Sequence, residues 1–186
     1  VAIENASELR AGAVTTDILE LNGVLTLNNP LAISTAAAMQ VNGISTVNFA
    51  TGHLLRVTNA LNTGTDNVAA TLNLVGAGTL QVDGWQNGNR PLTLNLQDAR
   101  VLFNRSGGLN TTLAVPAGGS GTVEVGNGVA ATLAGLNIGA GSTLRKVGPG
   151  WLATGTQTYG TDALLHLAAG GVLFNTTGGT NLTVDV

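Results

Sequence analysis

The chain of 186 residues has no cysteine, little charge and few aromatic side chains. Without cysteine it forms neither disulfides nor thiolate metal sites. Charged residues make up 9% of the sequence and aromatic residues 3%, whereas an average soluble domain is roughly 25% charged. The sequence therefore does not build an ordinary charged surface.

Long hydrophobic runs and clustered positive charge are also missing. No uninterrupted apolar run reaches the length of about 18 residues that predicts a membrane-spanning helix. The first residues lack the basic and apolar segments of an export signal, which is therefore expected to lie outside this sequence. The formal net charge is −3 and the seven Lys and Arg residues are scattered, so nucleic acid is not an expected partner.

The sequence is rich in hydrophobic residues, at 44%, and in glycine, of which it has 27. Short runs in which apolar and polar residues alternate predict strands, and they lie at residues 18–21, 24–27, 71–74, 79–82, 92–96 and 122–125. Glycine and asparagine between such runs predict sharp turns, at residues 22–23, 42–43, 76–78, 127–128, 139–141 and 170–171. Residues 34–39 are the only segment for which a helical turn is plausible, and they are too few for a stable helix.

Similar units begin at residues 21 and 41, about the spacing of one solenoid turn. We therefore predict a single all-β domain over residues 1–186, a right-handed parallel β-helix (β-solenoid) cut from a longer repetitive surface protein. Stacked turns would place the Leu and Val of one turn on those of the next. The alternative is an antiparallel β-sandwich, because Asn-Gly between alternating runs is also a strong hairpin signal.

A more specific pattern lies near the C-terminus and comprises Lys146, Gly148, Gly150, Leu152, Gly155, Thr158, Tyr159, Gly160 and residues 169–173. It resembles the passenger-associated repeat of bacterial autotransporters, from which Pro149, Trp151 and the spacing of the Tyr159 turn depart. The resemblance implies a right-handed parallel β-helix displayed on the cell surface through an outer-membrane barrel. It also implies a role in adhesion or self-association.

Enzymatic chemistry is not expected. Polysaccharide-cleaving β-helices need clustered carboxylates, and the ten acids here are spread along the chain. Stacking of turns would be needed to gather Asp66, Asp83 and Asp98. His53 and His166 have no metal-ligand spacing, so we predict no catalytic, cofactor or metal site.

The sequence favours a structural or adhesive extracellular segment, acting as a rigid stalk or in self-association. Its expected partners are copies of itself or a host or bacterial surface. The terminal strand is the predicted self-association edge, because strand edges carry unpaired backbone groups, and comprises Thr183, Val184, Asp185 and Val186. The alternative is a carbohydrate-binding or polysaccharide-degrading β-helix protein, with possible glycan contacts at Trp85, Trp151 and Tyr159.

Overall fold

The computed structural model describes residues 2–9, 13–28, 31–63, 69–84, 90–175 and 182–186. Within these ranges the chain forms eighteen strands and no helix. The strands are β1 (Ala2–Leu9), β2 (Ala13–Leu27), β3 (Leu31–Val41), β4 (Ile44–Phe49), β5 (Leu54–Val57), β6 (Leu61–Thr63), β7 (Ala70–Val75), β8 (Thr79–Val82), β9 (Leu92–Gln97), β10 (Ala99–Phe103), β11 (Gly107–Val115), β12 (Ser120–Val125), β13 (Ala130–Ile138), β14 (Thr143–Val147), β15 (Trp151–Tyr159), β16 (Ala163–Leu167), β17 (Gly171–Phe174) and β18 (Leu182–Asp185).

The strands pair in parallel, most of them with strands both one turn earlier and one turn later in the chain, whereas β1, β6, β17 and β18 each pair with one described strand. Leu94 pairs with Leu113 and Val47 with Leu74, so a turn takes 19 residues at one level and 27 at another. The single antiparallel bridge among the described residues joins Val75 and Asp98. The chain is thus a parallel β-solenoid, as predicted, and not an antiparallel sandwich.

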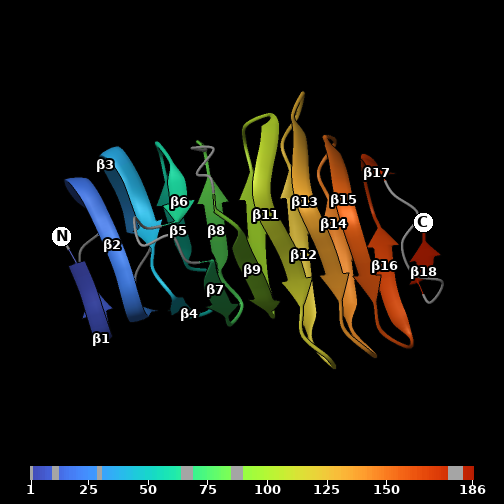
Figure 1. The fold of residues 1–186 in the computed structure, drawn as a ribbon, viewed down its shortest axis with the longest axis horizontal. Helices are drawn as coiled ribbons and strands as arrows, with labels where there is room; N and C mark the ends of the chain where they lie inside the picture. The colour runs from blue at the N-terminus through green and yellow to red at the C-terminus, as the bar shows by residue number, and fades with distance from the viewer. Residues whose placement is uncertain (1, 10–12, 29–30, 64–68, 85–89, 176–181) are drawn as a thin grey trace.

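Two long stacks of strands run along the coil, and the two chain ends lie at opposite ends of it (Figure 1). The first stack contains β4, β7 and β9, then the second halves of β11, β13 and β15. The second stack contains β5, β8, β10, β12, β14, β16 and β18. A third set pairs the first halves of β11, β13 and β15 and then β17. Because successive turns pair in register, side chains at the same register form columns along the axis.

The core fills the space between the stacks with Leu and Val columns. In the first stack Leu72, Leu94 and Leu113 are in register and each is fully buried. In the second stack Leu80 and Val101 are in register and likewise fully buried. Alternate residues point outward and are mostly half-buried Thr, Asn and Gln, as in the pattern of β7 and β9. The alternation in the sequence therefore records which side of the coil each residue faces.

The six predicted strand segments are all extended, in five strands because residues 18–21 and 24–27 both lie in β2. Two local predictions are wrong. Residues 34–39 lie inside β3, where pairing with β2, and of Met39 also with β6, holds the backbone extended. Asn22 and Gly23 lie inside β2 and pair with β1 instead of forming a turn. The turns expected elsewhere form, with positive φ at Gly43, Gly76 and Gly128 among others.

No helix long and apolar enough to cross a membrane occurs within the described ranges.

Candidate functional site

The C-terminal end of the coil leaves core positions uncovered. Among the described strands, β17 pairs with β15 and β18 pairs with β16, and neither has a partner on its other edge. We call this surface the open end, and it consists of Val172, Phe174, Leu182 and Val184. Their partners one turn earlier are buried, being Leu152, Thr154, Ala163 and Leu165. Phe174 and Val184 are nevertheless 38% and 48% exposed, because no described strand stacks on them.

The predicted self-association edge lies at this open end. Thr183, Val184, Asp185 and Val186 are all exposed, and Val186 is exposed over 91% of its surface. Register with β16 directs Val184 toward the core column of Leu165, and Thr183 toward the outside beside the half-buried Leu164. Oδ2 of Asp185 lies 2.9 Å from Nδ1 of His166. The edge therefore carries one inward apolar residue flanked by outward polar ones.

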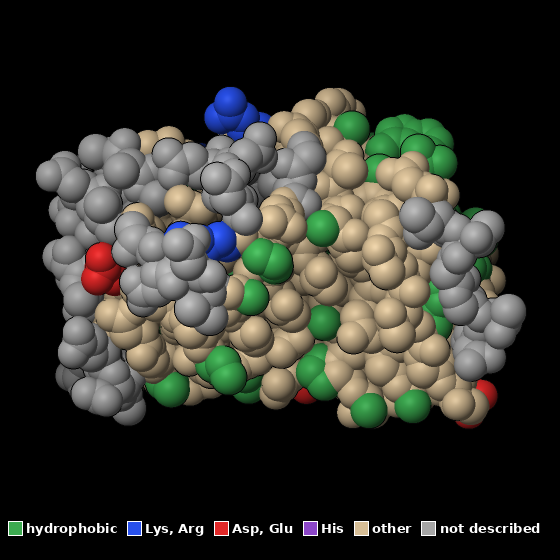
Figure 2. All heavy atoms as spheres, viewed as in Figure 1, with side chains coloured by type: hydrophobic (Ala, Val, Ile, Leu, Met, Phe, Trp, Pro, Cys, Tyr) green, Lys and Arg blue, Asp and Glu red, His purple; other side chains and the backbone are tan. Residues whose placement is uncertain are grey.

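Trp151 lies on the outer surface beside this end, in register with Gly171 of the last turn. A Cβ added to Gly171 would lie 2.4 Å from Cζ3 of the indole, so the glycine leaves the space that the ring occupies. Trp151 and Leu173 remain 58% and 53% exposed. Hydrophobic side chains gather over the part of the coil where β15 and β17 lie (Figure 2).

Of the three aromatic residues predicted as glycan contacts, the two that the structure describes do not lie side by side. Trp151 begins β15 and Tyr159 ends it, so the two lie at opposite ends of a nine-residue strand. Tyr159 packs against the core, and its hydroxyl is buried without a hydrogen-bond partner. Trp85 lies outside the described residues.

Lys146 is fully buried, at a position that register places between Val123 and Leu167. Its ammonium donates hydrogen bonds to the carbonyl oxygens of Val147 at 2.8 Å, Gly148 at 2.9 Å and Ala169 at 3.1 Å. Burial lowers the pKa of Lys146, and the charge of Glu124 opposes that shift. The side chain thus joins two successive turns of the coil at a corner.

The glycines of the same motif allow the corner turns to stack closely. A Cβ on Gly150 would lie 2.3 Å from the carbonyl oxygen of Gly126, one turn earlier. A Cβ on Gly170 would lie 2.3 Å from the carbonyl oxygen of Gly150, and Gly170 also has a φ of 74°. Within the motif that resembles the autotransporter repeat, Lys146, Gly150 and Gly170 therefore make contacts between successive turns.

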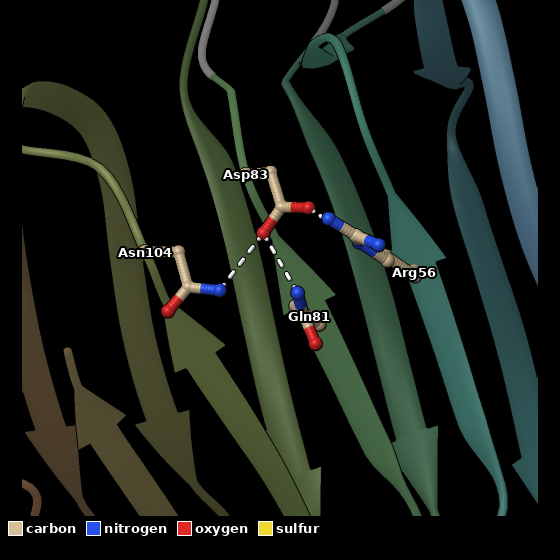
Figure 3. Close-up of polar contacts among 4 residues, drawn as sticks. All are labelled: Arg56, Gln81, Asp83 and Asn104. Carbon is tan, nitrogen blue, oxygen red and sulfur yellow. Dashed lines mark hydrogen bonds and ion pairs between the residues drawn. The ribbon is translucent and has the colours of Figure 1, made fainter.

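Asp83 is the centre of a polar cluster on the outer face of the second stack (Figure 3). Its carboxylate accepts hydrogen bonds from Arg56 Nε at 2.5 Å, Gln81 Nε2 at 2.8 Å and Asn104 Nδ2 at 2.9 Å. Burial raises its pKa, but these hydrogen bonds and the charge of Arg56 outweigh burial and hold the pKa of Asp83 below its ordinary value. An anion held in this way is suited to joining turns and poorly suited to taking up a proton.

Stacking does not bring Asp83 and Asp98 together. Asp83 follows the last residue of β8, whereas Asp98 precedes the first residue of β10. Because Arg100 pairs with Thr79, the two acids lie at opposite ends of these neighbouring strands, roughly 20 Å apart at about 3.3 Å per residue. Asp98 accepts a hydrogen bond of 2.5 Å from the Ser120 hydroxyl. Asp66 lies outside the described residues.

The histidines lie apart from each other. His53 is within 3.3 Å of the Leu27 carbonyl oxygen, and His166 contacts Asp185. In the part of the chain that the structure describes, no three His, Cys, Asp or Glu side chains come close enough to hold a metal ion.

Sequence reasoning missed the burial of Lys146 and the cluster around Asp83. The spacing of the sequence holds a signal for the Asp83 cluster, since Arg56 and Asn104 lie 27 and 21 residues from Asp83. Those separations match one turn of the coil, but the unequal turns hide the register.

Comparisons with models of protein families, with curated proteins and with solved structures find no match to this chain.

Proposed function

We propose that this chain is a structural segment of a bacterial surface protein, which associates with further copies of itself through the open end. The observation that carries the proposal is the register at that end. Val184 and Phe174 continue columns whose previous members are completely covered, and yet they are themselves exposed. A parallel strand, from another coil or from chain that follows this sequence, would cover them and pair with the edges of β17 and β18 that have no partner among the described strands.

The surface location and the relation to autotransporter passengers are part of this proposal. They are supported by the Lys146 to Leu152 motif, by the absence of cysteine and by the low charge. A stalk role follows from the same coil, because parallel strands that are paired along its length make it stiff.

The size of the uncovered surface determines how strongly two copies are expected to associate. Covering a fully exposed Val, Leu or Phe contributes about 1.5–3 kcal/mol, so completing the burial of the half-exposed residues here contributes a few kcal/mol. Association costs about 4–15 kcal/mol in lost freedom, which strand-to-strand hydrogen bonds must help to offset. We therefore expect weak association that appears as the protein concentration rises.

Light scattering behind size-exclusion chromatography tests the proposal. The molar mass of the wild type should rise above 18.6 kDa with concentration, and Val184→Asp should remain monomeric because a carboxylate would enter the core column. Thr183→Asp is the matched control, since it adds the same charge at the neighbouring outward position and should associate like the wild type. A wild type that stays monomeric at every concentration would overturn self-association.

A further inference from the structure

Charge is distributed unequally between the two stacks. The second stack presents Arg56, Arg100, Glu124, Arg145 and Asp185 on its outer side, with an ion pair between Arg100 and Glu124. From β4 to β15 no outward residue of the first stack is charged. Towards the N-terminus the stack continues into β2, where Thr26 is in register with Glu8 of β1. Charged residues favour exposed positions, so the uncharged outward residues of six successive strands indicate a partner that is recognised without charge.

The uncharged face is an ordered array of hydroxyl and amide groups. Thr71, Thr93 and Thr112 form one column in register, with Thr156 two turns further on. A second column, two residues along each strand, contains Thr46, Asn73, Asn95, Ala114, Asn137 and Thr158. Neighbouring turns lie about 4.8 Å apart and the two columns about 6.6 Å apart. The face therefore offers donors and acceptors at a regular spacing, which Gly135 interrupts in the first column and Ala114 in the second.

Hydrogen bonds within the second column orient part of this array. Asn95 Nδ2 donates to Asn73 Oδ1 at 2.9 Å, and Asn73 Nδ2 donates to Thr46 Oγ1 at 3.3 Å. These contacts fix the amides in one direction, so less side-chain freedom is lost when a ligand binds. The Thr column beside them contributes hydroxyl groups, each of which donates and accepts.

We propose that this face of the first stack binds a neutral polysaccharide, whose chain lies across successive turns. Sugar hydroxyls recur along such a chain and need uncharged donors and acceptors, which this face supplies. A second protein copy is a poorer match, because protein interfaces are enriched in aromatic side chains, Met and Arg. The proposal concerns a different surface from the open end, so it stands or fails independently of self-association.

Retention on neutral polysaccharides provides the test, with cellulose, chitin and soluble glucans and mannans as probes. The wild type should be retained on at least one of them, and retention should not change with ionic strength because no charges take part. Thr93→Glu should weaken binding roughly tenfold or more, since a carboxylate would face the sugar. Thr156→Glu, at an exposed position of the same column, checks that the loss does not come from misfolding.

Thr122→Glu is the matched control, because this half-buried Thr faces outward from the second stack between Arg100 and Arg145. It should bind like the wild type. Absence of retention on every neutral polysaccharide would overturn the proposal, as would equal losses in Thr93→Glu and Thr122→Glu. Salt-sensitive binding to polygalacturonate alone, or a fall in the molar mass of assemblies caused by Thr93→Glu, would also overturn it and indicate an acidic glycan or a second copy.

Discussion

A buried lysine replaces a hydrophobic residue in one core column of this coil. The stem of Lys146 occupies a position between Val123 and Leu167, and its ammonium is satisfied by three carbonyl oxygens from two turns. Two opposing effects act on the free energy of unfolding. Burial of the charge destabilises the fold, as the lowered pKa of Lys146 records, whereas the hydrogen bonds and the packed stem stabilise it.

Truncation of Lys146 separates these effects. We expect Lys146→Ala to lower the free energy of unfolding by about 2–5 kcal/mol, because it leaves a cavity and three carbonyls without their donor. Lys146→Met should cost less, since its side chain fills the space of the stem and no charge is buried. Urea denaturation measures both, with the exposed Arg145→Met as a control within about 0.5 kcal/mol of the wild type. Equal costs for the Ala and Met variants would mean that the ammonium contacts dominate.

Tyr159 is the only tyrosine of the chain, so its titration can be observed directly. Burial raises the pKa of Tyr159 to about 12, from 10.0 in the unfolded chain. The folded state therefore holds the proton more tightly, and this contribution to stability is complete below pH 10 and is lost as the pH rises from 10 to about 12.

Tyrosinate absorbance of the folded protein should accordingly show a midpoint near 12, and the denatured protein one near 10. Tyr159→Phe should remove this part of the pH dependence. At neutral pH it should change the free energy of unfolding by less than about 1 kcal/mol, because the buried hydroxyl has no partner to lose. A midpoint near 10 in protein that circular dichroism shows to be folded would contradict the burial of this hydroxyl.

At the scale of strands and corners, the alternation of apolar and polar residues identified the strands, because inward residues lie in the apolar core and outward residues face solvent. The runs at residues 71–74 and 92–96 became β7 and β9 for this reason. Residues 34–39 were misread because three of them are alanine, the residue with the highest intrinsic helix propensity, and pairing with β2 overrides that preference.

The contacts between turns were harder to predict than the strands. One turn takes 19 residues where Leu94 meets Leu113 and 27 where Val47 meets Leu74, so no fixed period aligns the sequence with itself. The grouping of Arg56 with Asp83, and the uncharged face, both depend on that register. The strand edge at residues 183–186 was predictable because it needs only the end of an alternating run.

At the scale of the whole molecule, the coil is close to one-dimensional, since each turn contacts only the turns before and after it. Internal strands such as β12 pair on both edges, with β10 and β14, whereas β17 and β18 pair on one edge among the described strands. In such arrays stability is the sum of local terms and contacts between neighbours. The last turn therefore has about half the stabilising contacts of an internal turn.

Hydrogen exchange followed by mass spectrometry should show this gradient directly. At low protein concentration, amides of β18 should exchange fastest, those of β16 more slowly and those of β12 and β14 slowest, because local opening needs less free energy at an uncovered end. At high concentration, exchange of β17 and β18 should slow in the wild type and not in Val184→Asp, if the open end is covered by another copy. Equal protection from β12 to β18 at low concentration would show instead that the turns unfold as one cooperative unit.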